Sequence, residues 1–321
     1  DKNGLRPSRW VLTRNGWLTA ASEIGVNAYK PEDVVAKGRV GPGQILVVDT
    51  EAGKILHSDD VANYLKVRQP YAKWIKENAY FVESTLAEHV PALKPMSMDE
   101  CEIHMKMFQV SFEETEQVLR PLAEQSAEGT GSMGDDTPIA VLSRHVRPLY
   151  DYFRQVFAQV TNPPIDSLRE RHVMSLKTRF SNLANILEEK SQNADVLVLD
   201  SPVLTAHDWR KLKSAFGPLG AEIDCTYDIS AGQEGLRAAI TRIREEAVAA
   251  VRMGKSELFL TDDNISEDRV GIAMILAAAA VHTHLVRNGL RSYSSINVRS
   301  AECLDTHYFA VLIGVGATTV N

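Results

Sequence analysis

Hydrophobic and polar positions near the start of the chain alternate in the way that β-hairpins require. Residues 9–22, RWVLTRNGWLTAAS, place Asn15 and Gly16 between two runs rich in Val, Leu, Thr and Trp. This pattern predicts an antiparallel hairpin closed by a type I′ turn. Residues 44–57, QILVVDTEAGKILH, predict a second hairpin with Glu-Ala-Gly as its turn. The sequence therefore predicts an antiparallel region over residues 1–57 that is not a complete domain.

The following stretch has no such regular pattern. Residues 58–95 are mixed and charged, with a short amphipathic segment at 71–79, which is typical of a linker that runs over a surface. Two amphipathic helices are expected next, at 98–108 and 112–128. The second helix follows Ser111, and Glu114 three residues later completes a capping box.

From residue 195 onward the pattern changes to short apolar or β-branched runs that alternate with helix-length segments. The predicted strands are 195–200, 222–229, 257–262 and 293–298, and the predicted helices are 206–216, 234–253 and 270–288. Alternation of this kind predicts parallel strands joined by right-handed crossovers, hence an α/β fold. A partial (β/α) barrel and an open doubly wound sheet both fit.

One loop between helical patterns is unusually stiff. Residues 157–176 read FAQVTNPPIDSLRERHVMSL. The proline pair fixes two φ angles and pushes the preceding residue toward extended geometry, while Ser167 and Glu170 form a capping box that predicts a helix through Leu176. The loop itself consists of neutral polar side chains and prolines: Gln159, Thr161, Asn162, Pro163 and Pro164. It is interpreted either as a rigid connector or as a loop that lines a passage or contacts a neighbouring domain.

Composition narrows the class of protein. The chain has 321 residues, 44% of them hydrophobic and 24% charged, with a net charge of -7, which is ordinary for a globular protein. It lacks the clustered Lys and Arg of a nucleic-acid surface. The longest apolar run, 272–281, is far shorter than the ~20 residues of a membrane span. We therefore expect neither a nucleic-acid partner nor a membrane partner.

The cysteines do not indicate a metal or disulfide site. Cys101, Cys225 and Cys303 lie far apart in the sequence, without C-x-x-C spacing. A reducing, cytoplasmic location is the expectation from this pattern.

Two sequence motifs are typical of a dinucleotide site and a metal site, but their sequence context does not fit either site. Residues 129–134, GTGSMG, match the dinucleotide fingerprint G-x-G-x-x-G, but a charged helix precedes them and two aspartates follow, where a strand and a phosphate site are required. We interpret them as a loop. His282 and His284 are two positions apart on a predicted helix, so they point about 200° apart and cannot share one metal ion.

Charged residues at strand ends leave a second possibility open. Asp200, Asp262 and Asp263 lie at the carboxyl ends of predicted strands, where α/β folds place ligands. Strand-end aspartates also cap helices, and no catalytic triad, nucleophile elbow or zinc motif accompanies them. A ligand-binding or catalytic barrel that uses Asp200, Asp262 and Arg299 remains the alternative to a non-catalytic domain.

The chain contains the sequence blocks DKNGLRPSR, AASEIGV, KGRVGPGQILVVD, GSMGDDTPIAVLS, FRQVFAQVTNPPIDSLRERHVMSL, LDSPVLT, AAVHTHLVRNGLR and LDTHYFAVLIGVGATTVN. Together these blocks resemble the large (alpha) subunit of glutamate synthase, and locally they resemble the bacterial NADPH-dependent type. The resemblance covers nearly the whole chain. Both ends look cut, so we expect a fragment of a longer polypeptide.

The resemblance implies a domain order and a fold for each part. Residues 1–57 correspond to the end of an Ntn-type class II glutamine amidotransferase domain, 58–95 to a linker, and 96–321 to the glutamate synthase central domain. The central domain of this family is a rudimentary (β/α) barrel-like parallel sheet with helices. The expected partners are the flanking amidotransferase and FMN-binding synthase domains of the same chain, together with a glutamate synthase small subunit.

The resemblance also implies an activity for the parent enzyme. Members of this family hydrolyse glutamine, pass ammonia through the protein and use it in the reductive amination of 2-oxoglutarate to glutamate. The parent is expected to use FMN and a 3Fe-4S cluster, with NADPH and FAD on the small subunit, although ferredoxin as electron donor stays open. None of these cofactor sites, nor the catalytic cysteine, falls in this chain. The expected role here is to hold the neighbouring domains in register and to border the ammonia passage with the loop that contains Thr161 and Asn162.

Overall fold

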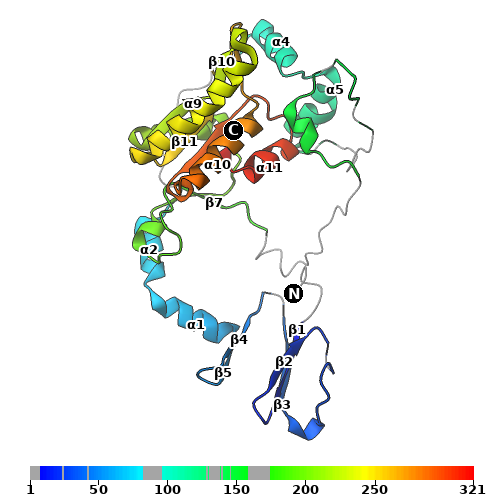
Figure 1. The fold of residues 1–321 in the computed structure, drawn as a ribbon, viewed down its shortest axis with the longest axis vertical. Coiled ribbons are helices and arrows are strands. Elements are labelled where there is room, and N and C mark those ends of the chain that lie inside the picture. The colour runs from blue at the N-terminus through cyan, green and yellow to red at the C-terminus, as the bar shows by residue number, and fades with distance from the viewer. Residues whose placement is uncertain are drawn as a thin grey trace. The chain divides into compact units, whose positions relative to one another are not determined.

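The computed structural model describes residues 8–23, 25–41, 43–81, 96–127, 129, 138, 140–144, 146–157 and 174–321. The chain divides into two compact units, one of residues 1–72 with 160–175 and one of residues 73–159 with 176–321. Figure 1 shows the elements of both units. Each unit is described by itself below.

The first unit contains the two predicted hairpins. Strands β1 (Ser8–Thr13), β2 (Leu18–Ala21) and β3 (Val34–Val40) form an antiparallel sheet in the order β2-β1-β3. A short 3-10 turn, η1 (Pro31–Asp33), precedes β3. Strands β4 (Leu46–Asp49) and β5 (Lys54–His57) form the second hairpin. The ring of His57 lies 5.8 Å from that of Trp10, so an aromatic contact joins β5 to β1.

The first hairpin has a different turn from the one predicted. The Thr13 amide donates to the Trp17 carbonyl over 2.9 Å, which leaves a three-residue loop with Gly16 at a φ of 82°. A type I′ turn needs positive φ at both central residues, and in the described chain Asn15 is not among the residues with positive φ. The predicted type I′ turn is therefore wrong, because only the glycine adopts the left-handed conformation.

The segment predicted as a linker begins with two helices, α1 (Ser58–Arg68) and α2 (Tyr71–Asn78). The sequence pattern indicated only the second of them. Helix α1 begins with a box in which the His57 amide donates to the Asp60 carboxylate over 3.0 Å, an arrangement that satisfies an otherwise free helix-end group.

The helices before the central sheet largely match their predictions. Helix α4 (Met98–Met107) begins at the Ser97 capping box. The next helix consists of α5 (Phe112–Glu114), the π-helical turn η2 (Thr115–Leu119) and α6 (Arg120–Gln125). The predicted capping box is confirmed, since the Glu114 amide donates to Ser111 Oγ over 3.2 Å. Pro121 has no N–H for the carbonyl four residues earlier, and the helix widens at this point.

A small three-stranded sheet precedes the main one. It has the order β6-β8-β7, made of β6 (Tyr80–Phe81), β7 (Thr178–Phe180) and β8 (Leu197–Leu199). Strand β8 corresponds to the predicted strand at 195–200. The predicted helix at 167–176 lies mostly outside the described residues, and its described end, 174–176, is not helical.

The main sheet is parallel and has four strands in the order β14-β13-β11-β9. Its strands are β9 (Gly220–Asp224), β11 (Glu257–Thr261), β13 (Ser295–Arg299) and β14 (Thr319–Val320). Each strand lies next to its predecessor in the chain. A doubly wound sheet would reverse direction at a switch point, so the sequential order favours the partial barrel among the two predicted architectures.

Helices cover both faces of this sheet (Figure 1). Helices α9 (Gly232–Arg252), α10 (Met274–Arg287) and α11 (Thr306–Gly314) pack on one face through a core that contains Leu258, Leu260, Ile296 and Val298. Helix α8 (Ala206–Phe216) shares a second core with Phe259, whose ring meets that of Trp209 edge to face at 5.2 Å.

The predicted strand at 222–229 is interrupted. Strand β9 ends at Asp224, and β10 (Thr226–Asp228) turns away to pair antiparallel with β12 (Arg269–Gly271). Strand β12 occupies the start of the predicted helix 270–288, so α10 begins only at Met274. A continuous apolar pattern cannot show such a break, since strand and helix starts look alike over a few residues.

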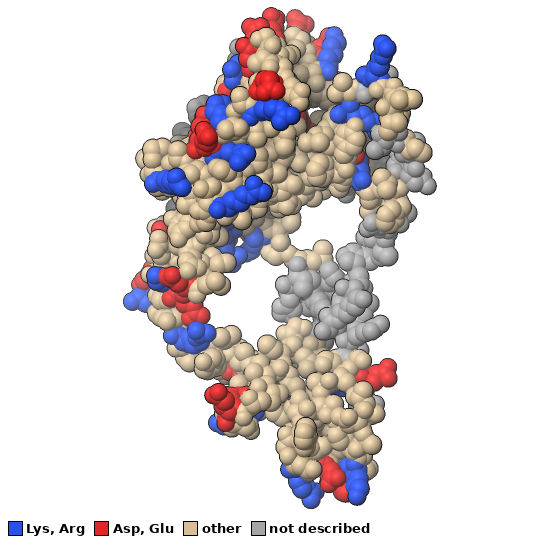
Figure 2. All heavy atoms as spheres, in the orientation of Figure 1, with Lys and Arg blue, Asp and Glu red and all other residues tan. Residues whose placement is uncertain are grey.

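The exposed face drawn in Figure 2 carries charges of both signs, interspersed over the helices. Along α9, for example, Arg242 pairs with Glu246 at 3.1 Å. In the part of the chain that the structure describes, no helix combines the length and apolarity needed to cross a membrane.

Candidate functional site at the carboxyl end of the parallel sheet

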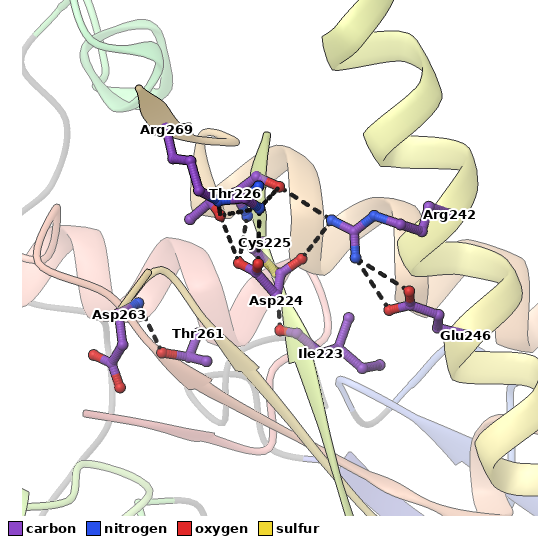
Figure 3. A network of polar contacts seen from close by, with 9 residues as sticks. All are labelled: Ile223, Asp224, Cys225, Thr226, Arg242, Glu246, Thr261, Asp263 and Arg269. Atoms are coloured by element: carbon purple, nitrogen blue, oxygen red, sulfur yellow. Dashed lines mark hydrogen bonds and ion pairs between the residues drawn. The ribbon is translucent and has the colours of Figure 1, made fainter. Parts of the chain in front are cut away.

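Three of the strand-end residues that the sequence singled out, Asp262, Asp263 and Arg299, lie at the carboxyl edge of the main sheet together with Asp224, which was not predicted. Asp224 ends β9, Asp262 and Asp263 follow β11, and Arg299 ends β13. Parallel strands bring these ends to one edge, which is where ligands bind in α/β proteins. Figure 3 shows part of this edge.

The carboxylate of Asp224, at the end of β9, lies in a network of hydrogen bonds (Figure 3). Asp224 Oδ1 accepts hydrogen bonds from the amide and the hydroxyl of Thr226 over 2.9 and 2.7 Å, and Asp224 Oδ2 accepts from Arg269 Nη2 over 2.9 Å. Burial would raise the pKa of Asp224, but the bonds from Thr226 and the charge of Arg269 outweigh burial and lower it. The carboxylate is therefore charged and fully engaged within the protein.

Arg242 of α9 connects the end of β9 and the start of β10 to that helix. Its Nη2 donates to the carbonyls of Asp224 and Thr226 over 2.7 and 3.1 Å, while Nη1 pairs with Glu246. The carbonyl groups that β9 leaves free where the sheet breaks therefore have partners. This satisfaction of buried backbone groups explains how the chain turns out of the sheet at Cys225 without losing stability.

Asp262 is the most buried carboxylate of this edge, with 6% of its surface exposed. Its Oδ2 accepts from Ser300 Oγ over 2.7 Å and from the Ala301 amide over 3.3 Å. Burial raises the pKa of Asp262 to about 6, and the nearby Glu302 carboxylate adds to the rise. The group joins the end of β11 to the loop after β13.

The remaining strand-end charges are also paired. Arg299 Nε lies 3.3 Å from Asp263 Oδ1. Glu302 Oε2 accepts from the Tyr308 hydroxyl over 2.5 Å and from the Met274 amide over 2.9 Å. Through these bonds Glu302 joins the starts of α10 and α11.

The thiols near this edge are not nucleophiles. Cys225 is completely buried, and burial raises the pKa of its thiol to about 12. Burial raises the pKa of Cys303 as well. The thiolate is the reactive form of cysteine, and burial disfavours that form at both positions. Within the described residues there is also no group of three His, Cys, Asp or Glu side chains placed to hold a metal ion.

The structure separates the residues of the alternative barrel site. Asp200 follows β8 in the small sheet, is exposed, and lies 3.6 Å from Lys177 Nζ. No hydrogen bond or ion pair joins Asp200 to Asp262 or Arg299 among the described side chains. Asp200 therefore follows a strand of another sheet than Asp262 and Arg299, while the chain just after it bridges to Val320 at the end of β14.

Several earlier candidates contribute little here. Gln159, Thr161, Asn162, Pro163 and Pro164 lie outside the described residues. His282 accepts a hydrogen bond from Arg291 Nε over 3.1 Å, whereas His284 lies 3.2 Å from Arg244 Nη2. Of the glycine-rich segment only Gly129 is described, and a Cβ there would lie 2.8 Å from the Gln117 carbonyl oxygen.

The partners that hold the strand-end charges were not predicted from the sequence. They are Thr226, Arg242, Arg269, Ser300, Glu302 and Tyr308. Ser300 could have been found, because a hydroxyl residue just after a strand often caps the next turn. The arginines gave no signal, since charged helix positions usually face solvent.

The fold and this edge define a class: a sequentially ordered parallel β/α domain whose strand-end charges bind groups of the same domain, preceded by antiparallel hairpins. Comparison with known protein families identifies the family within this class. The family described as "Glutamate synthase central domain" matches residues 103–321, and "Glutamine amidotransferases class-II" matches residues 1–74. The chain therefore belongs to the glutamate synthase central domain family, with the end of a class II glutamine amidotransferase domain before it.

Individual relatives agree with the family match. The chain is 47% identical to the NADPH glutamate synthase large chain of Azospirillum brasilense and 41% identical to the chloroplastic ferredoxin-dependent glutamate synthase 2 of Arabidopsis thaliana. It is 34% identical to the NADPH glutamate synthase large chain of Bacillus subtilis. Each match covers 100% of this chain but only 21%, 20% and 21% of the relative. The chain thus spans about a fifth of the curated relatives it matches, and the predicted boundaries at residues 57 and 95 stay predictions.

Proposed function

We propose that this chain is a non-catalytic connecting region of a glutamate synthase, the enzyme that couples glutamine hydrolysis to the reductive amination of 2-oxoglutarate. The observation that carries the proposal is that the strand-end charges at the carboxyl edge of the main sheet bind groups of the same domain. Asp224, Asp262 and Arg299 each bind groups of the same domain. Charged side chains that already bind groups of their own domain are not available to bind a substrate. Their arrangement therefore favours a structural role over a substrate site.

The same proposal gives the chain its partners. In this proposal the region holds the flanking amidotransferase and FMN-binding domains of the same polypeptide in register, in a cytoplasmic enzyme with a small subunit. The parent would use FMN and a 3Fe-4S cluster. Cys101, Cys225 and Cys303 lie far apart in the sequence and do not have the spacing of such a cluster. The printed names of the relatives include NADPH and ferredoxin forms, so the electron donor depends on domains beyond this chain.

The second part of the proposal concerns ammonia. Ammonia becomes protonated in water near neutral pH and is then a poor nucleophile, so its transfer requires a closed path lined by neutral polar groups. The loop of Gln159, Thr161, Asn162, Pro163 and Pro164 has this chemistry and the stiffness of two fixed φ angles. We assign it to the border of the ammonia passage.

Substitution in the full-length enzyme tests this role. Asn162→Phe should reduce the glutamate formed per glutamine hydrolysed, because a bulky apolar side chain would narrow the path without touching either active site. Asn162→Gln, which keeps a neutral amide, is the matched control and should retain most of the coupling. Full coupling in Asn162→Phe would contradict the assignment.

One observation favours a second function, a ligand-binding barrel. Asp262 lies at the carboxyl edge with its pKa raised to about 6, and perturbed carboxyl groups often mark active sites. Calorimetric titration of this chain and of its Asp262→Asn variant with FMN, glutamine and 2-oxoglutarate separates the two functions. Binding that Asp262→Asn abolishes would favour the barrel, whereas binding that survives the substitution would not.

A further inference from the structure

A short segment that precedes the stiff loop (residues 159–164) packs on the first turn of α11. It contains the 3-10 turn η3 (Leu149–Phe153). The ring of Tyr150 lies 4.8 Å from that of Tyr308 on α11, and Tyr150 also packs against the core that covers the main sheet. Aromatic rings at this separation attract each other. The segment is therefore attached to the domain that contains the main sheet.

An ion pair and a hydrogen bond hold the end of this segment. The guanidinium of Arg154 pairs with Asp305 Oδ2, and His307 Nε2 donates to the Phe153 carbonyl over 3.0 Å. Asp305 is the cap of α11, and His307 lies in its first turn. Two neighbouring residues of the segment, one through its side chain and one through its backbone, are thus bound by the same helix end.

Asp305 makes two different contacts at this helix end. Its Oδ1 accepts from the Tyr308 amide over 2.8 Å and so caps α11, while its Oδ2 binds the Arg154 guanidinium. Tyr308 is 2% exposed, and its hydroxyl donates to Glu302, which also accepts from the amide at the start of α10. The helix end that binds Arg154 is therefore itself fixed within the core, so it provides a rigid support.

The anchored residues lie close to the stiff loop along the chain. Gln159, the first residue of the loop, follows Arg154 by five residues and belongs to the same compact unit. Five residues span at most about 18 Å, so an anchor at Arg154 limits the places where the loop can start. Fixing one end of a segment also removes conformations that the segment would otherwise have.

We propose that Arg154 and Asp305 are positioning residues for glutamate formation, because their ion pair fixes the start of the stiff loop. This role rests on the proposed position of the loop at the ammonia passage. Both residues act through the loop rather than on a substrate. The neutral polar groups of the loop must keep one arrangement for ammonia to pass, so loss of the anchor should let ammonia escape to solvent.

Two substitutions in the full-length enzyme remove the ion pair and retain the helix cap. Arg154→Gln keeps a polar side chain without the charge, and Asp305→Asn keeps a good N-cap residue. We expect each to lower the glutamate formed per glutamine hydrolysed, by up to about fivefold, which is the largest change that the loss of one exposed ion pair supports. The amides of residues 149–157 should exchange faster within the same limit.

The double variant tests whether the two residues act as a pair. It should lower the ratio no further than the larger single effect, since the second substitution removes a contact that is already lost. Arg154→Lys keeps a positive charge opposite Asp305 and should restore most of the ratio. Lys213→Gln is the matched control, because it removes another exposed ion pair, with Glu222 on β9, and should leave the ratio unchanged.

Three results would separate this role from the proposed function. A wild-type ratio in Arg154→Gln and Asp305→Asn, together with a lowered ratio in Asn162→Phe, would overturn the positioning role alone. Additive losses in the double variant would overturn it as well, since the two residues would then act separately. A wild-type ratio in Asn162→Phe would overturn the proposed passage and this role with it. Glutamine hydrolysis, measured in the same assay, reports whether each variant is folded.

Discussion

At the scale of single residues, Arg291 shows how a buried charge can be held by carbonyl groups. Its Nη1 donates to the Ser294 carbonyl over 2.6 Å, Nη2 to the Gly316 carbonyl over 2.8 Å, and Nε to His282 Nδ1. Gly316 has a φ of +119°, and a Cβ there would collide with the His282 ring. The arrangement closes the turn between α11 and β14, and only glycine fits it.

Gly316→Ala should therefore destabilise this part of the sheet. The strained φ and the clash together should cost about 2–4 kcal/mol, seen as faster hydrogen exchange in β13 and β14. Gly314→Ala is the matched control, because a Cβ at Gly314 meets nothing within 4 Å. Equal exchange in both variants would show that the turn relaxes freely.

Asp262 gives a pH-dependent prediction at the same scale. Its pKa rises from 3.8 to about 6 on folding, so the wild type should lose stability as pH rises between those values. Asp262→Asn should be more stable than the wild type by about 2–3 kcal/mol above pH 6 and should gain nothing near pH 3.5. Hydrogen exchange measured over a range of denaturant concentrations at both pH values gives the difference in the free energy of unfolding. A loss of stability at pH 8 would mean that the charged carboxylate is favoured.

At the scale of elements, the sequence predicted helix starts best where it contains side chains that bond to free backbone amides. The capping box at Ser111 and Glu114 gave the correct helix start, because two side chains satisfy two free amides there. The break at Cys225 could not be predicted, since it depends on Arg242 and Arg269 from distant segments. Helix α11 and strand β14 were missed because their apolar run is continuous and has no period.

Another capping box predicts the stability of α8. Thr205 Oγ1 accepts from the Asp208 amide over 3.2 Å, and Asp208 Oδ2 accepts from Thr205 Oγ1 over 2.6 Å. Thr205→Ala should lower the local stability of α8 by about 1 kcal/mol, measured as faster exchange of its first amides. His207→Ala, at an exposed position in the same turn, should change exchange little. No difference between the two would indicate that packing of Trp209 alone fixes the helix start.

At the scale of the whole molecule, the order of elements was predictable and the placement of charges was not. Alternating strands and helices from residue 195 onward gave the α/β class, and the sequential order β9, β11, β13 and β14 selects the partial barrel. Asp262 and Asp263 were found from the sequence, whereas Asp224 and the partners of all three aspartates required the fold. This pairing turns a candidate binding edge into a structural one.

The most direct test of the connecting role compares two substitutions in the full-length enzyme. The measured quantity is the glutamate formed per glutamine hydrolysed, for Asn162→Phe in the stiff loop and Asp262→Asn at the sheet edge. We expect this ratio to fall in Asn162→Phe and to stay at the wild-type value in Asp262→Asn. An unchanged ratio in Asn162→Phe together with lost glutamate formation in Asp262→Asn would contradict it.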